Sequence, residues 1–202
     1  MSKQNIVIIK YNAGNIRSVD NALKRLGQNA EITDDREKIA RADKVIFPGV
    51  GEASTTMEYL NRTGLSELIL SITKPVLGIC LGMQLMSKHS EEGNTDSLGI
   101  FNESVIKFKT NKADFHHLKI PHMGWNKIYN LKGSLFDSSL EGEYVYFVHS
   151  YYMPVGLETV STSDYGISFS SAVQHRNFFA TQFHPEKSGP VGELILSNFL
   201  KL

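Results

Sequence analysis

The sequence predicts an α/β fold, with a mixed, largely parallel sheet flanked by helices and with antiparallel strands added in the C-terminal half. Two patterns lead to this prediction. In the first half, short apolar runs alternate with segments whose apolar residues recur every three or four positions. Short links between such strands and helices favour a parallel sheet covered on both faces. In the second half, strand-like runs follow one another with short links, which is typical of antiparallel strands.

The expected elements of the first half begin with a β-branched apolar run from Asn5 to Lys10, which predicts a buried strand. After a turn, the apolar residues take helical spacing at Ile16, Val19, Leu23 and Leu26, and Gly27 is suited to end this helix. Further strands are expected at 30–33, 44–47 and 75–79. Further helices are expected from a cap at Asp34 or Asp35 to Ala42, over 54–72 and over 81–89.

The second half contains five strand-like runs, at 103–109, 144–153, 158–164, 168–174 and 178–183. A last helix is expected over 192–202, because its apolar residues are spaced to pack on the sheet: Leu194, Ile195, Phe199 and Leu202. No repeat or linker divides the chain, and 202 residues favour one domain spanning 1–202.

The composition excludes several classes of protein. Lys plus Arg number 21 and Asp plus Glu number 21, so no net charge attracts nucleic acid or an anionic membrane. No apolar run approaches the roughly 20 residues that cross a bilayer. The first residues do not resemble a signal peptide, and we expect a cytoplasmic location.

Cys80 is the single cysteine of the chain, which excludes an internal disulfide. It stands in Gly78-Ile79-Cys80-Leu81-Gly82, a G-x-nucleophile-x-G pattern between an expected strand and an expected helix. Such a turn exposes the sulfur at a helix N-terminus, where the helix dipole favours a thiolate. The N–H of Leu81 would then point at an oxyanion. Alternatively, Cys80 is a small buried hydrophobe, as free cysteines often are.

A general base is expected at His184, in Phe183-His184-Pro185-Glu186 after the last strand. Residues two apart on an extended strand share a face, so His184 and Glu186 are expected to point to one site, with Pro185 keeping the backbone extended. An imidazole can take the thiol proton while a carboxylate orients it. Taken alone, this segment also fits a surface turn at a strand end.

Together, Gly78 to Gln84 and His184-Pro185-Glu186 resemble the triad-type (class I) glutamine amidotransferases, and Pro48-Gly49-Val50-Gly51 is similar to that family's glycine loop. The resemblance covers essentially the whole chain. It implies the family's α/β fold and glutamine hydrolysis by Cys80, His184 and Glu186. It also implies an oxyanion hole formed by Gly49, Val50, Gly51 and Leu81. The glutamine pocket that it implies is formed by Gln84, Glu92, His149, Ser150 and Tyr151.

Within the family, three further segments resemble glutaminase subunits that supply ammonia in histidine biosynthesis: Tyr11 to Asn15, Pro121 to Asn126 and His149 to Tyr151. The resemblance implies a (β/α)₈-barrel cyclase subunit as the heterodimer partner. It places the interface at Asn12, Asn15, Pro121, His122, Met123, Gly124, Trp125, Asn126 and Lys187. Trp125 lies in an expected Gly- and Pro-flanked loop, where it is either an interface anchor or a core residue, and we favour the interface.

Three alternative functions stay open. The first is a glutaminase that feeds another synthase, such as one that amidates surface sugars. The second is a cysteine hydrolase or peptidase that acts alone, and the third is a binding subunit without catalysis. The complete Cys80, His184 and Glu186 set argues against the last, and Gln84 with the glycine loop argues against a hydrolase acting alone.

We expect neither a metal nor a cofactor. His116, His117 and His122 are close in sequence, but no cysteine or H-E-x-x-H pattern accompanies them. No phosphate-binding G-x-x-x-x-G-K-[ST] or dinucleotide-binding G-x-G-x-x-G pattern occurs.

Overall fold

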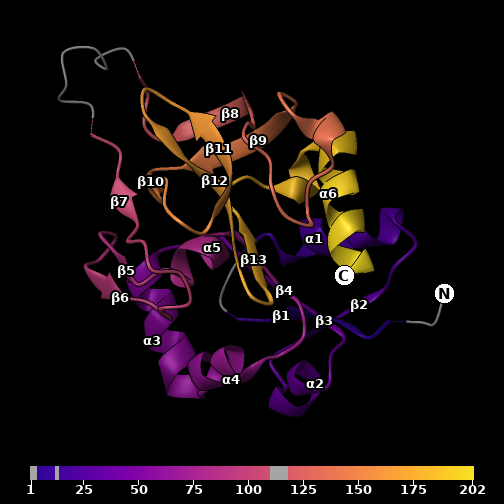
Figure 1. Cartoon of the computed structure of the whole chain (residues 1–202). Helices are drawn as coiled ribbons and strands as arrows, with labels where there is room; N and C mark the ends of the chain where they lie inside the picture. Colours follow the sequence, from indigo (N-terminus) through magenta and orange to yellow (C-terminus); the bar gives the residue numbers. More distant parts are fainter. Residues whose placement is uncertain (1–3, 12–13, 110–117) are drawn as a thin grey trace.

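The computed structural model describes residues 4–11, 14–109 and 118–202. Its centre is a seven-stranded sheet in the order β11-β12-β13-β4-β3-β1-β2 (Figure 1). The strands are β1 Ile6–Ile9, β2 Ala30–Thr33, β3 Lys44–Gly49, β4 Val76–Cys80, β11 Thr159–Asp164, β12 Ser168–His175 and β13 Phe178–Thr181. Five neighbouring strands are parallel, in the order β2, β1, β3, β4 and β13. The strand β12 is antiparallel to both of its neighbours, β13 and β11. The predicted mixed, largely parallel sheet is therefore confirmed.

Helices cover both faces of this sheet. The helices are α1 Ile16–Arg25, α2 Arg36–Ala40, α3 Ala53–Thr63, α4 Leu65–Ser71, α5 Leu81–Leu85 and α6 Gly189–Lys201. Side chains along β1 alternate between two cores, as expected for a strand with both faces buried. Ile6 and Ile8 pack in the core that includes residues of α1 and α6, whereas Val7 and Ile9 pack in the core with residues of α2, α3 and α4 (Figure 1).

Three two-stranded antiparallel pairs lie outside the central sheet. The strand β8, His122–Lys127, pairs with β9, Tyr144–His149. The strand β7, Ile106–Lys107, pairs with β10, Tyr151–Tyr152, and β5, His89–Ser90, pairs with β6, Thr95–Asp96. Figure 1 shows β8 and β9 beside β11 and β12, on the same side of the molecule as α6.

Several expected boundaries are wrong. The helix expected over 54–72 is two helices, because Gly64 takes the left-handed backbone conformation (φ +70°) and ends the first. The helix expected over 81–89 ends at Leu85, since residues 89–90 form a hairpin strand. The strand over 103–109 is reduced to β7, and the run 144–153 is divided into β9 and β10. Residues 122–127, expected as a loop, are the strand β8.

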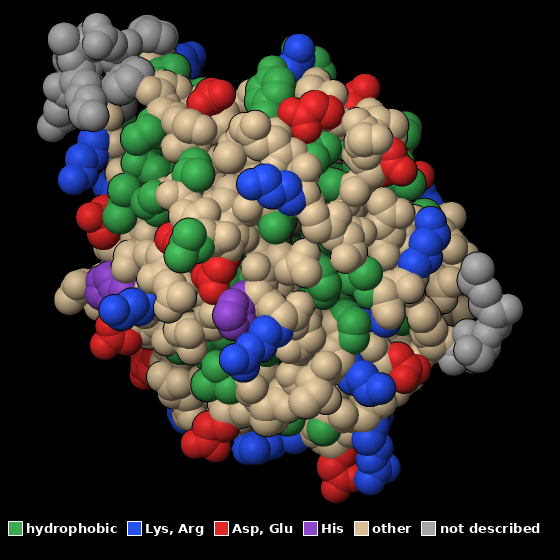
Figure 2. All heavy atoms as spheres, viewed as in Figure 1, with side chains coloured by type: hydrophobic (Ala, Val, Ile, Leu, Met, Phe, Trp, Pro, Cys, Tyr) green, Lys and Arg blue, Asp and Glu red, His purple; other side chains and the backbone are tan. Residues whose placement is uncertain are grey.

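No helix in the described part of the chain is long and apolar enough to cross a membrane. On the face shown in Figure 2, acidic and basic side chains are scattered among one another, in agreement with the balanced charge count.

Candidate active site

The three predicted motifs meet at the carboxyl ends of three neighbouring strands. Gly49 closes β3 and pairs with Cys80, the last residue of β4. On the other side of β4, Thr181 of β13 pairs with Ile79, and His184 follows three residues later. Parallel neighbouring strands end at one edge of a sheet, so residues far apart in the sequence lie around the sulfur.

Cys80 occupies a strained turn between β4 and α5. Its backbone has φ 53° and ψ −105°, an unusual conformation for a residue other than glycine. A methyl group on Gly82 would overlap the carbonyl oxygen of Phe47, and one on Gly78 would lie 3.0 Å from the carbonyl carbon of Gly82. Strand and helix therefore approach too closely for a side chain at either glycine, which confirms the physical reading of the G-x-C-x-G pattern.

The predicted base and its carboxylate lie together in the interior. His184 Nδ1 is 2.7 Å from Glu186 Oε1, and both side chains are buried. The expected extended backbone is wrong, because Pro185–Lys187 form a 3-10 turn. The turn itself brings Glu186 back to the imidazole. His184 is fixed further by its backbone N–H, which donates to Tyr146 O at 2.9 Å, and by its carbonyl, which accepts from Ser188 Oγ at 2.6 Å.

The charge state of His184 suits proton transfer. Burial lowers the pKa of His184, but the negative charges of Cys80 and Glu186 outweigh burial and raise it to about 10. The imidazole is therefore cationic at neutral pH when the sulfur is ionised. Among the described residues, His184 Nε2 has no hydrogen-bond partner, so this nitrogen is available to exchange a proton with a reacting group.

Asn15 lies in the site rather than only at the expected interface. Its Nδ2 donates to Glu186 Oε1 and lies 3.5 Å from His184 Nδ1. Asn15 takes a left-handed conformation (φ 72°) before α1, and its side chain makes no cap with that helix. The amide is therefore free to hold the carboxylate. No local signal pointed to this contact, because it joins residues at opposite ends of the chain.

Tyr11 holds the glycine loop, Pro48 to Gly51, in place. The Tyr11 hydroxyl donates to Pro48 O, and the ring packs against Phe47 with centroids 5.4 Å apart. Burial, together with the charge of Cys80, raises the pKa of Tyr11, so the hydroxyl keeps its proton for this bond. Gly51 has φ +140°, which favours glycine. Of the predicted oxyanion donors, Gly49 pairs with Cys80 and Leu81 follows it directly. The role of Gly49, Val50, Gly51 and Leu81 stays a prediction.

The residues expected to bind glutamine surround the same edge. Gln84 Nε2 donates to Tyr151 O at 3.0 Å, and Glu92 Oε2 accepts from Ala53 N at 2.9 Å, next to the glycine loop. Burial, with a contribution from nearby Glu52, raises the pKa of Glu92. The His149-Ser150-Tyr151 segment continues from Val148, whose carbonyl oxygen is 3.7 Å from Cys80 Sγ.

Gln182 was not predicted from the sequence. It is fully buried, and its Nε2 is 3.7 Å from Cys80 Sγ. Its position two residues before His184 was the available signal, because residues two apart on an extended strand share a face.

A buried pair of histidines lies behind this segment. His149 Nδ1–H donates to Tyr151 O at 2.7 Å, so His149 Nε2 is the acceptor for His122 Nδ1–H at 2.9 Å. His122 is only 3% exposed and stacks on Phe147 and Tyr165. Its expected place at the interface is therefore wrong: successive residues on β8 face opposite sides, and His122 is on the inner side.

Acid is expected to destabilise the fold through this pair. Burial lowers the pKa of His122 to about 4 and that of His149 to about 3, the latter despite the bond to Tyr151 O. The two buried neutral imidazoles therefore make their full contribution to the free energy of unfolding above pH 6.5, the pKa of an unfolded histidine. This contribution is lost as pH falls from 6.5 toward the pKa values of the folded chain. The pKa of His184 is raised instead, so its contribution increases by roughly 1 kcal/mol as pH falls from 7 through 6.5, which offsets only part of the loss. We expect the free energy of unfolding to fall by about 2 kcal/mol between pH 7 and pH 5, measured by urea denaturation.

The variant His122→Gln should show a shallower pH dependence, because it carries one buried imidazole fewer. His89→Gln is the matched control, since His89 is partly exposed at the β5–β6 hairpin. An equal slope in all three proteins would contradict the assignment to the buried pair.

The outer face of β8 and β9 is apolar and exposed. The cross-strand pairs Trp125–Tyr146 and Lys127–Tyr144 share this face, as does Met123. Met123 is 63% exposed and Trp125 is 56% exposed. The Lys187 amine lies 6.0 Å from the centre of the Tyr146 ring, so the end of the triad segment borders the same face.

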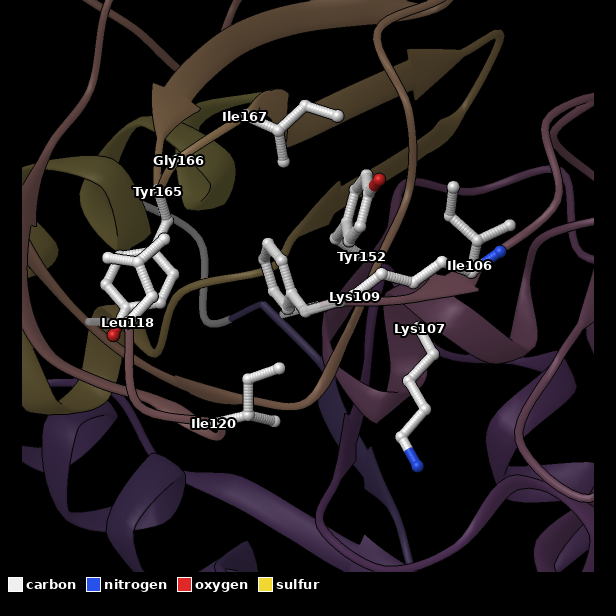
Figure 3. A pocket seen from close by; sticks show the side chains of 10 residues that line it. Ile106, Lys107, Lys109, Leu118, Ile120, Tyr152, Tyr165, Gly166 and Ile167 are labelled. Carbon is white, nitrogen blue, oxygen red and sulfur yellow. The ribbon is translucent and has the colours of Figure 1, made fainter. Parts of the chain in front are cut away.

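The remaining predicted interface residues are less uniform. Asn126 is half-buried, and its Nδ2 donates to Asp164 O at 2.8 Å. Pro121 is exposed and Gly124 is half-buried. Asn12, His116 and His117 lie outside the described residues. Figure 3 shows a mainly apolar cavity that is lined by none of the predicted site residues; Ile106, Tyr152, Tyr165 and Ile167 line part of it.

Comparisons with known proteins agree with this geometry. Residues 7–202 match the family model described as glutamine amidotransferase class-I. The imidazole glycerol phosphate synthase subunit HisH of Bacteroides fragilis (strain YCH46) is 58% identical, over 98% of this chain and 99% of the relative. The protein of the same name from Pasteurella multocida (strain Pm70) is 50% identical, over 98% of each chain. A crystal structure of a glutamine amidotransferase superposes with a TM-score of 0.72 at 18% identity, covering 96% of this chain and 97% of the other.

The last similarity concerns the fold alone, whereas the family model and the two relatives extend over nearly the whole sequence. This chain therefore belongs to the class-I glutamine amidotransferase family and, within it, to the imidazole glycerol phosphate synthase subunits HisH.

Proposed function

We propose that the chain hydrolyses the side-chain amide of L-glutamine with Cys80, His184 and Glu186. We further propose that it passes the ammonia to a partner, as the glutaminase subunit of imidazole glycerol phosphate synthase. The observation that carries the proposal is the strained Cys80 turn beside a buried His184–Glu186 pair, in which His184 Nδ1 lies 2.7 Å from Glu186 Oε1. Family membership supports glutamine as the substrate.

In the first half-reaction, the Cys80 thiolate attacks the amide carbon of glutamine. The C–N bond breaks, the nitrogen takes a proton from His184, and a glutamyl thioester forms as ammonia leaves. Glu186 accepts the hydrogen bond from His184 Nδ1–H and stabilises the imidazolium. Water then attacks the thioester carbon and His184 accepts its proton; the C–S bond breaks, which restores the Cys80 thiolate, and glutamate leaves. The N–H groups of Leu81 and of the loop from Gly49 to Gly51 stabilise the oxyanion in both steps.

The pocket for glutamine is assigned to the groups around this edge. The approach to the sulfur is lined by Gln84, Glu92 and the segment from His149 to Tyr151. Two kinds of contact support this assignment: Glu92 bonds to the backbone next to the glycine loop, and Gln84 and His149 both bond to Tyr151 O. No cofactor takes part in the proposed reaction.

The partner is a (β/α)₈-barrel cyclase subunit that uses the ammonia to form imidazole glycerol phosphate and aminoimidazole carboxamide ribonucleotide. The exposed apolar face of β8 and β9 supports this assignment, because exposed aromatic residues are typical anchors of protein interfaces. Lys187 at its edge follows Glu186 by one residue, so a partner bound here would contact the catalytic turn.

The test is glutamine hydrolysis by the purified chain, measured with and without the cyclase subunit and its ribonucleotide substrate. We expect a large increase when both are present. Trp125→Ala should reduce this increase, whereas Leu157→Ala should not, because Leu157 is fully exposed at a separate loop. Hydrolysis that ignores the cyclase would reject this partner and point to another synthase or to a hydrolase acting alone.

A further inference from the structure

Two buried glutamines form a chain that ends at the Cys80 sulfur. Gln84 lies on α5 and Gln182 lies just after β13; they are 5% and 0% exposed. Gln84 Nε2 is 3.0 Å from Tyr151 O and 2.9 Å from Gln182 Oε1. Gln182 Nε2 is 3.7 Å from Cys80 Sγ.

The orientation of both amides follows from one carbonyl group. Tyr151 O can only accept, so the atom of Gln84 that faces it must be the nitrogen. The second proton of that nitrogen then faces Gln182, which must present its oxygen. Gln182 is thereby obliged to direct its N–H₂ group toward the sulfur of Cys80.

This donor acts against another group beside the sulfur. Val148 O lies 3.7 Å from Cys80 Sγ and can accept a hydrogen bond from a thiol, but it repels a thiolate. Gln182 N–H does the opposite, because it can donate only to sulfur lone pairs and interacts most strongly when the sulfur is charged. The site is buried, where such interactions are less screened than in water.

We propose that Gln182 stabilises the Cys80 thiolate through its side-chain N–H, and that Gln84 is a positioning residue that fixes the Gln182 amide in the donating orientation. Gln182 touches the reacting sulfur, so it contributes directly to the nucleophile, whereas Gln84 acts through it. The proposal deepens the proposed function and rests on it, because it concerns the thiolate that attacks glutamine.

The test is the rate of alkylation of Cys80 by iodoacetamide as a function of pH, followed by mass spectrometry of the whole chain. Cys80 is the single cysteine, so every modified molecule reports on this sulfur. The measurement uses neither glutamine nor a partner, and a failure of the proposed glutaminase function would not affect it.

The variant with the largest expected effect is Gln182→Glu. It keeps the shape and the oxygen that accepts from Gln84, and it replaces the donor beside the sulfur with a second carboxylate oxygen. We expect alkylation at pH 7 to slow by about tenfold or more, with the pH midpoint raised by about one unit. Gln182→Met, which removes the donor without adding charge, should give a smaller rise. Because Gln182→Glu also adds a negative charge, Gln182→Met decides the role of the donor: a midpoint in Gln182→Met equal to that of the unmodified chain would overturn the proposal.

Two further variants separate this effect from loss of structure. Thr181→Val removes a neighbouring buried hydroxyl that donates to Phe183 O at 3.0 Å, so it should lower the melting temperature and leave the alkylation midpoint unchanged. A rise equal to that of Gln182→Glu would attribute the effect to structure and overturn the proposal. Gln84→Met frees the Gln182 amide to turn, and it should raise the midpoint less than Gln182→Glu. No rise with Gln84→Met would overturn the positioning role.

Discussion

Replacing Cys80 by alanine is expected to abolish glutamine hydrolysis, with a loss of at least about 10⁴-fold in kcat. Removal of a nucleophile that works with a base commonly costs this much or more. The physical reason is that no thioester can form, and the sulfur is the one thiol of the chain. The measurement is glutamate release by the variant in the presence of the cyclase subunit and its ribonucleotide substrate.

The same variant should still support synthesis when ammonium is added in place of glutamine. Cys80 is only 7% exposed and is not part of the exposed face of β8 and β9, so its loss leaves the exposed residues of that face in place. Retained hydrolysis of glutamine by Cys80→Ala would remove Cys80 from its proposed role. Loss of the ammonium-dependent reaction would instead indicate that the substitution disturbs assembly.

Gly82→Ala is expected to cost at least about 3 kcal/mol in the free energy of unfolding. The new methyl group would overlap Phe47 O, a backbone atom in β3, and would lie against the Phe47 ring at 3.6 Å. A backbone carbonyl of a central strand cannot move without disturbing its pairing with β1 and β4. Thermal unfolding should show a melting temperature lower by roughly 6–12 °C, the range expected for a chain of this size.

Gly27→Ala is the matched control. Gly27 also has a conformation that favours glycine (φ +72°), but a methyl group there would meet nothing within 4 Å. We expect a cost of about 1 kcal/mol, which arises from the backbone conformation alone. If Gly82→Ala cost no more than Gly27→Ala, the close approach of α5 to β3 would not be what requires glycine.

The sequence predicted well those features that arise from local chemistry. Alternating apolar periods placed the strands β1 to β4 and the helix α1 within a residue or two, because burial of one face imposes a period on any strand or helix. The glycines around Cys80 indicated the strained turn for a similar reason: a tight approach excludes side chains at fixed neighbouring positions. Asp35, one of two expected caps, indeed accepts from the N–H groups of Glu37 and Lys38.

Local patterns misled where glycine or proline stands inside a regular element or where the chain turns unexpectedly. Pro121 and Gly124 suggested a loop around Trp125, yet pairing with β9 makes this segment a strand. Gly64, by contrast, interrupts a run of helical spacing that otherwise reads as continuous. In both cases neighbouring segments decide whether the backbone continues, and a single-sequence pattern does not contain them.

By itself, the sequence predicted the fold class, the strained turn at Cys80 and the proximity of His184 and Glu186, because strand and helix periods, the glycines around Cys80 and the His-Pro-Glu spacing are all local. The tertiary structure alone decided that β13 lies beside β4, that Asn15 reaches Glu186, that His122 is buried against His149, and that Gln182 faces the sulfur. Those contacts join residues between 27 and 171 positions apart. They arise from strand order and register, which are set when the whole core packs. A local period, such as the two-residue spacing of Gln182 and His184, does not say which distant segment lies opposite.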